Sequence, residues 1–193
     1  MALSILPPHA DRLRLHPVAP RVAPMFCLAL LTASCALASF ALACATPFAA
    51  FAVLAAAMLP LRPALLVVTG AWLVNQTIGF GALHYPVDGN TIAWGVAIGA
   101  AALLATAVSS AVLRTLPQGR TALALAVTLV AAYAAYELAL LAATPVLGGE
   151  GAFTAAIVTR IGLTSAAWLA GLVAACEIVR LVDPFGHKRA ISA

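Results

Sequence analysis

Charged residues are scarce in this chain of 193 residues, where they account for 8% of the positions against 64% for hydrophobic residues. Soluble domains contain about 25% charged and about 45–50% apolar residues, so this composition excludes a soluble globular enzyme. Intrinsic disorder is excluded as well, because it requires low hydrophobicity and high charge. The composition predicts a single all-α domain that crosses a lipid bilayer several times.

Catalytic and cofactor-binding motifs are also missing. The chain contains no Walker A sequence, no HExxH motif and no GxSxG arrangement. An intramembrane enzyme that used Glu137 and Arg160 would lack a nucleophile or a set of metal ligands. We therefore expect no enzymatic activity and no intrinsic cofactor.

The cysteines form neither a CxxC pair nor a zinc-binding spacing with histidine. All four fall within apolar stretches, at Cys27, Cys35, Cys44 and Cys176. A buried free thiol behaves as a small hydrophobic side chain, so the cysteines predict no dedicated metal centre.

Apolar runs long enough to cross a bilayer fill the middle of the chain. A spanning helix needs about 20 apolar residues, and residues 1–24, with five prolines and three arginines, are expected to form an extended cytoplasmic tail instead. Residues 25–182 are expected to form a domain of six transmembrane helices, and residues 183–193 a second, short cytoplasmic tail. The second helix is short enough to be tilted or re-entrant. The expected helices cover residues 25–45, 47–60, 64–83, 91–113, 121–143 and 152–181.

The basic residues give the expected orientation. The net charge is +4, but the basic residues flank apolar runs, which is typical of topology signals and not of a nucleic-acid partner. With the N-terminus in the cytoplasm, nine of the ten Lys and Arg residues fall in inner segments, and the outer loops carry only Asp88 and Glu150. Merging the first two helices would place Arg62 outside. The positive-inside rule therefore favours six spans with both ends in the cytoplasm. A cleaved signal peptide is disfavoured, because the first apolar run, of about 21 residues, exceeds the 7–15 residues of a signal core.

Residues 72–86 hold the densest group of polar side chains inside an apolar run. Asn75 and Gln76 are adjacent, about 100° apart around a helix, so one lipid-facing stripe cannot hide both. One interpretation is that they hydrogen-bond across helices beneath an aromatic belt. The other is an outward-facing ligand site with these two residues at its floor and residues 84–94 at its rim.

Two pairs of ionisable residues are close enough in expected depth to interact. Glu137 and Arg160 lie at similar depth on consecutive helices, where they would either fix helix packing or line a polar cavity open to the outside. Glu177 lies three residues before Arg180, near the inner end of the last helix, and an interfacial ion pair is expected there.

His84 is the one histidine outside the two tails. A neutral imidazole can ligate cobalt, iron, copper or zinc. A single histidine makes no dedicated metal site, but it could supply one axial ligand to a metal already held in a macrocycle.

The segment Trp72-Leu73-Val74-Asn75-Gln76-Thr77-Ile78-Gly79-Phe80, followed by His84-Tyr85-Pro86 and Trp94-Gly95, resembles the BtuM family. Members are small bacterial cobalamin-uptake proteins similar to the substrate-binding S-components of ECF-type vitamin transporters. The motif covers residues 72–95, and the rest of the chain resembles the family in its six-helix architecture alone.

The resemblance implies a multi-pass protein of the bacterial inner membrane that binds cobalamin or a related corrinoid in an outward-facing pocket and moves it inward. An ECF transmembrane and ATPase module could be its partner, or it could act alone. Some members use a cysteine as an axial cobalt ligand, but this chain has none between residues 45 and 175. His84 or Cys44 would take that place, and the Ala29/Ala33 face resembles the surface through which S-components meet their partner.

The resemblance and the polar cluster together give one set of expected substrate-binding residues. Asn75 and Gln76 would bind corrin amides, the aromatic side chains would pack on the macrocycle, and His84 would be the axial cobalt ligand. The full set is Asn75, Gln76, Phe80, His84, Tyr85, Trp94 and Arg160. The alternative function is a membrane assembly factor or a subunit of a larger complex, in which the polar cluster would serve packing alone.

Overall fold

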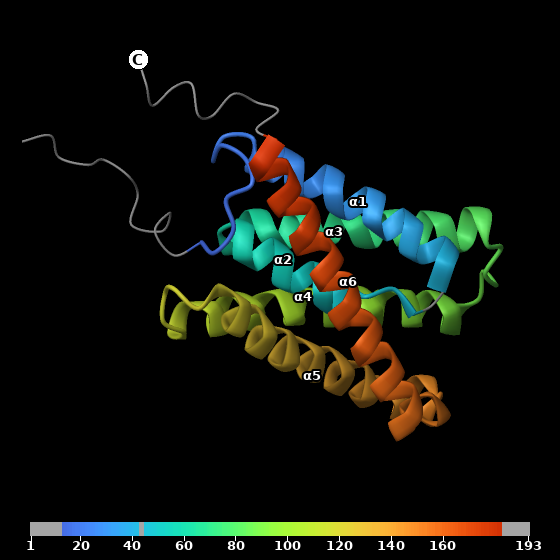
Figure 1. Ribbon diagram of the computed structural model, residues 1–193. Helices are drawn as coiled ribbons and strands as arrows, with labels where there is room; N and C mark the ends of the chain where they lie inside the picture. Colours follow the sequence, from blue (N-terminus) through green and yellow to red (C-terminus); the bar gives the residue numbers. More distant parts are fainter. Residues whose placement is uncertain (1–12, 43–44, 183–193) are drawn as a thin grey trace, which may run out of the picture.

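The computed structural model describes residues 13–42 and 45–182, which form a bundle of helices without a strand (Figure 1). A short π-helix, η3, continues α3, and a 3-10 turn, η4, precedes α6. The elements are α1 (Ala23–Leu42), α2 (Phe48–Met58), α3 (Leu61–Thr77), η3 (Ile78–Ala82), α4 (Gly89–Thr115), α5 (Thr121–Leu147), η4 (Glu150–Phe153) and α6 (Ala155–Val182).

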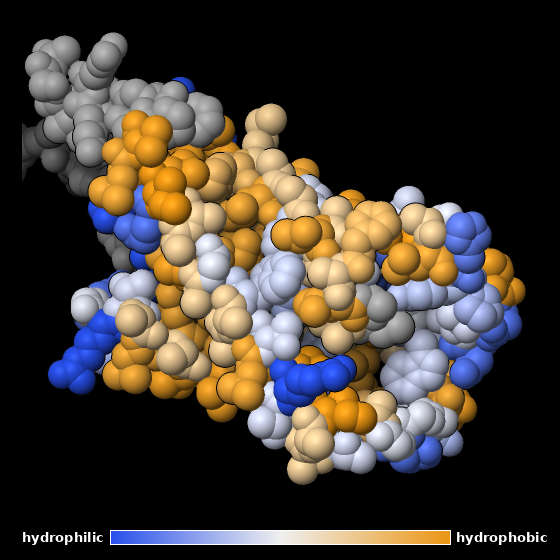
Figure 2. Space-filling model, turned by 45° about the vertical axis from the view of Figure 1, so that its right-hand side comes forward, coloured by the Kyte–Doolittle hydropathy of each residue, from blue (hydrophilic) through white to orange (hydrophobic). Residues whose placement is uncertain are grey.

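Five helices are long and apolar enough to cross a membrane: α1, α3 together with η3, α4, α5 and α6. Large apolar side chains on them are exposed, among them Leu66, Val130 and Leu163. Figure 2 shows apolar surface along the helices and hydrophilic residues mainly towards the two ends. The chain therefore has the character of a multi-pass membrane protein, with five helices of spanning length where the sequence predicted six.

The short helix α2 forms the centre of the bundle. Its 11 residues extend over about 16 Å at 1.5 Å per residue, which is too short for a full span. All of them are buried, and α2 contacts the five other helices α1, α3, α4, α5 and α6. A helix that is hydrophobic all round is typical of a buried core, and α2 carries no polar side chain. The prediction of a short second helix is confirmed.

The two ends of the bundle differ in charge. At the basic end α1, α3 and α5 begin and α2, α4 and α6 end (Figure 1). The opposite end carries the turn at residues 83–88 and the segment at residues 148–154, with Asp88 and Glu150. The described arginines of the basic end are Arg14, Arg21, Arg62, Arg114, Arg120 and Arg180.

Residues 13–22 pack onto the basic end, although the sequence predicted an extended tail there. The backbone amides of Arg14 and Leu15 donate to the carbonyl of Ala57, at 2.8 and 3.1 Å. The last carbonyls of a helix have no intrahelical partner, and this segment supplies donors at the end of α2. The expected tails at residues 1–12 and 183–193, and Cys44, lie outside the described residues.

Helix α5 continues past Pro145 to Leu147, whereas the sequence predicted its end near residue 143. Proline has no amide hydrogen, so it leaves the carbonyl four residues earlier without its usual donor. The hydroxyl of Thr144 donates to that carbonyl, on Leu141, at 2.8 Å. This bond compensates for the proline and allows another turn of helix.

Candidate functional site

Asn75 is the centre of a hydrogen-bond network inside the bundle. Its Nδ2 donates to Ser39 Oγ on α1 at 2.9 Å and to Thr46 Oγ1, just before α2, at 3.1 Å. Ser39 and Thr46 are both buried. The side chain of Asn75 therefore joins three segments, and both hydrogens of its amide group are already donated.

Gln76 extends this network towards α4. Its Nε2 donates to Asn75 Oδ1 at 3.0 Å, and its Oε1 lies so close to Gly95 that a Cβ atom there would collide with it. A glycine at this position lets the helix backbone approach closely. Gln76 thus fills the gap between α3 and α4 that Gly95 leaves open.

Trp72, one turn before Gln76 on α3, also links α3 to α4. Its indole Nε1 donates to the carbonyl of Gly95 at 2.9 Å. A Cβ atom built on Gly99 would lie 2.7 Å from the indole ring. The spacing of Gly95 and Gly99 is the GxxxG pattern of close helix pairs in membranes, here with a tryptophan and a glutamine of α3 against the two glycines.

The π-helix η3 ends α3 and positions two aromatic side chains. Gly79 is buried, and a Cβ atom on it would lie 2.8 Å from the ring of Tyr85. The rings of Phe80 and Tyr85 meet edge to face, with centroids 6.4 Å apart. Short π-helical segments occur frequently at functional sites, and this one turns Phe80 and Tyr85 towards each other.

His84 lies in the exposed turn between η3 and α4. Its φ of 55° is in the left-handed region, where histidine is enriched among non-glycine residues. The turn ends at Asp88, which accepts hydrogen bonds from the amide and the hydroxyl of Thr91, both at 2.9 Å. These bonds hold the pKa of Asp88 below its usual value. They also make Asp88 the N-cap residue of α4.

Trp94 lies on α4 and Arg160 on α6, at the same end of the bundle as His84. Trp94 is half-buried on α4, and its ring lies 3.4 Å from the Cβ position of Gly149, just after α5. Arg160 is exposed on α6 and lines a cavity of about 510 Å³ beside the end of α1. The other residues that line this cavity are Phe40, Ala41, Leu42, Ala45, Ile161 and Thr164.

The predicted ion pair between Glu137 and Arg160 does not form. Glu137 interacts with Tyr133, one turn earlier on α5, and the hydroxyl of Tyr133 donates to the carbonyl of Val158 at 2.6 Å. The predicted pair of Glu177 with Arg180 is present, with 2.7 Å between Oε2 and Nη2, and it is the one ion pair among the described residues. Similar depth on two consecutive helices was therefore not sufficient to predict an ion pair between Glu137 and Arg160.

The expected site residues form two contact groups and three separate positions. Asn75 contacts Gln76, and Phe80 contacts Tyr85. His84 lies in the exposed turn, and Trp94 and Arg160 lie on other helices. Sequence reasoning missed Ser39 and Thr46 as the partners of Asn75. Small polar residues in an alanine-rich chain carry no signal that would have singled them out.

Within residues 13–42 and 45–182, no group of three or more His, Cys, Asp or Glu side chains could hold a metal ion. His84 is thus a single exposed imidazole, with one coordination position to offer to a metal held by another molecule.

Comparisons with protein-family models, with curated proteins and with solved structures find no match to this chain. Its function must therefore be inferred from the arrangement of its own residues.

Proposed function

We propose that this chain is a multi-pass protein of a bacterial inner membrane. It binds cobalamin or a related corrinoid at the end of the bundle that holds His84, opposite the basic end, and moves the corrinoid inward. The network centred on Asn75 is the observation that carries this proposal. It lies in a largely apolar bundle, at the end of α3 that leads into η3, the aromatic pair and the exposed turn of His84. Polar side chains within membrane-spanning helices are costly and mark ligand pathways.

Each group at this end has a role that its chemistry permits. A corrinoid carries peripheral amides, a flat apolar macrocycle and a cobalt ion with axial positions. Gln76 would pair with an amide, the edges of Phe80 and Tyr85 would pack against the ring, and the exposed His84 would ligate the cobalt. Because both Nδ2 hydrogens of Asn75 are donated within the bundle, its role in this proposal is to position Gln76.

Arg160 adds a cation at the same end of the molecule. The cavity that it lines, of about 510 Å³, lies within the range of about 300–1,000 Å³ typical of small-molecule sites. The guanidinium offers five donors to carbonyl or phosphate oxygens of a ligand. A molecule as large as a corrinoid would extend beyond this cavity, and we expect it to reach the exposed turn around His84.

A second function, as an assembly factor or subunit of a larger membrane complex, is favoured by one observation. The polar network is already satisfied by Ser39, Thr46 and Asn75, as expected of interhelical hydrogen bonds that serve packing. Under this alternative, protein subunits would co-purify with the chain, and no corrinoid would be retained.

The visible absorption spectrum of the purified protein distinguishes the two functions. After incubation with cobalamin and removal of free ligand, the wild type should retain a corrin band with a shift caused by axial ligation. His84→Ala should abolish the shift and weaken binding by at least about tenfold, or about 1.4 kcal/mol. His16→Ala is the matched control, because His16 is also exposed but lies in the segment that packs on the basic end.

Two results would count against the proposal at different levels. No retained band in folded wild-type protein would remove the corrinoid function. An unchanged spectrum and affinity in His84→Ala would leave corrinoid binding standing but remove His84 as the cobalt ligand.

A further inference from the structure

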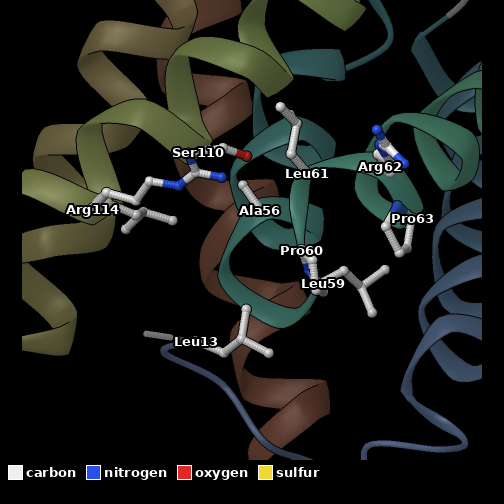
Figure 3. A pocket seen from close by; sticks show the side chains of 10 residues that line it. Leu13, Ala56, Leu59, Pro60, Leu61, Arg62, Pro63, Ser110 and Arg114 are labelled. Atoms are coloured by element: carbon white, nitrogen blue, oxygen red, sulfur yellow. The ribbon is translucent and has the colours of Figure 1, made fainter. Parts of the chain in front are cut away.

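A second cavity of about 510 Å³ lies at the basic end, between the end of α2, the start of α3 and the end of α4 (Figure 3). Two of its lining side chains are cationic, Arg62 on α3 and Arg114 on α4. In Figure 3 the guanidinium of Arg114 extends towards Ser110, and Arg62 lies on the other side of Leu61. None of the residues expected at the corrinoid site lines this basic-end cavity.

Ser110 lines this cavity with an unused hydroxyl. The residue is 7% exposed, and its Oγ has no hydrogen-bond partner among the described residues. Its neighbours on α4 behave differently, since Thr106 donates to Ala102 O and Ser109 donates to Ala105 O, at 2.8 and 2.7 Å. A buried hydroxyl without a partner is unfavourable, so Ser110 is poised to hydrogen-bond to a molecule in the cavity.

The start of α3 adds donors to the same cavity. This helix of 17 residues begins after Pro60, without a side-chain cap, and Leu61 and Arg62 line the cavity. The amides of Leu61 and Arg62 have no intrahelical acceptor. By contrast, Pro63 has no amide hydrogen, and Ala64 donates to the carbonyl of Pro60 at 3.0 Å. The helix dipole is positive at this end. Helix starts of this kind bind anions such as phosphate.

Negative partial charges near the cavity are neutralised by Arg14. Its guanidinium donates to the carbonyls of Leu113, Leu116 and Pro117, at 2.9, 2.6 and 2.7 Å. Leu113 lies in the last turn of α4, and Leu116 and Pro117 follow directly after it. The helix dipole is negative at this end and would otherwise repel an anion. Of the four acidic residues that the structure describes, only Glu177 belongs to the basic end, and it is paired with Arg180.

We propose that the basic-end cavity binds a phosphate group, either of an anionic phospholipid or of a free phosphate compound. The guanidinium groups of Arg62 and Arg114 donate charge-assisted hydrogen bonds to the oxygens of the phosphate group. The Ser110 hydroxyl and the amides of Leu61 and Arg62 donate to the remaining oxygens. This site does not depend on corrinoid binding, because it uses other residues at the other end of the bundle.

Two binding measurements on the detergent-purified full chain test the site and identify the source of the phosphate. Native mass spectrometry counts bound phosphatidylglycerol, with phosphatidylcholine as the zwitterionic comparison, and equilibrium dialysis measures radiolabelled inorganic phosphate. We expect Arg114→Gln to weaken binding of the true ligand by about tenfold, and Ser110→Ala by about fivefold, since each removes hydrogen bonds to a charged group. Loss in the lipid measurement assigns the site to a headgroup, and loss in the dialysis measurement assigns it to free phosphate.

Arg120→Gln and Ser109→Ala are the matched controls. Arg120 is an exposed arginine of the same end, and Ser109 is the buried neighbour whose hydroxyl is already bonded. Both controls should bind as the wild type does, and Ser110→Ala should not lower the midpoint of thermal unfolding, because it removes an unpaired hydroxyl. The proposal is overturned if neither probe binds, if Arg120→Gln weakens binding as much as Arg114→Gln, or if Ser110→Ala binds normally.

Discussion

Replacing Arg14 by methionine is expected to lower the free energy of unfolding by about 3 kcal/mol, because the end of α4 would lose its donors. The guanidinium donates to three carbonyls located 99 to 103 residues away in the sequence. A buried acceptor that loses its partner costs about 1–3 kcal/mol, and water can reach part of this surface, so the sum falls below three full penalties. Unfolding titrations in detergent measure the difference directly.

Arg21→Met is the control for this experiment. Arg21 is exposed and lies in the same segment, so its replacement should change the free energy of unfolding by less than about 0.5 kcal/mol. Arg14→Lys should fall between the two, because an ammonium group keeps the charge but lacks the planar fork of donors. Equal free energies of unfolding for Arg14→Met and Arg21→Met would show that the hydrogen bonds of Arg14 do not stabilise the bundle.

Replacing Gly99 by valine is expected to destabilise the bundle by about 3 kcal/mol, because overpacking typically costs about 1–3 kcal/mol and a hydrogen bond is lost as well. The first added carbon would lie 2.7 Å from the Trp72 ring. The ring is rigid, so α3 and α4 would have to separate, and the bond from Trp72 to Gly95 O would lengthen. The same titration measures the effect, with the fluorescence of the indole as a local signal.

Gly171→Val separates overpacking from the general effect of a β-branched residue in a helix. Gly171 lies inside α6, and a Cβ atom on it would meet nothing within 4 Å. Helix propensities of glycine and valine differ by only about 0.5 kcal/mol, so this variant should be close to neutral. A comparable loss at both glycines would contradict the close packing of α3 on α4.

The long helices could be predicted from sequence because length and apolarity act locally. The same local signals misplaced the end of α5, since they could not show that the Thr144 hydroxyl takes the carbonyl that Pro145 leaves open. They also assigned Arg14 to a tail, because its partners on α4 are distant in sequence. The shortness of α2 could be predicted from the sequence, whereas its central position follows from contacts with five other helices.

The candidate site was predictable in part for similar reasons. Two adjacent polar residues on one helix required partners, and Asn75 and Gln76 have them. Depth along the helices could be counted for Glu137 and Arg160, but their directions around the helices depend on packing angles that no residue spacing reveals. A side chain at position 95 would collide with Gln76, and this follows only from how closely α3 and α4 pack together.

In the proposed orientation the end that holds His84 faces the outside of the cell, where it would receive the corrinoid, and the basic end faces the cytoplasm. Cysteine labelling in intact spheroplasts with a membrane-impermeant maleimide tests it most directly. His84→Cys and Arg120→Cys, each in a chain that also carries Cys44→Ala, place a thiol at an exposed position of either end, while Cys27, Cys35 and Cys176 are buried. We expect position 84 to be labelled in intact spheroplasts and position 120 to be labelled only after permeabilisation. The reverse pattern, or labelling of both positions from the same side, would contradict the proposed orientation.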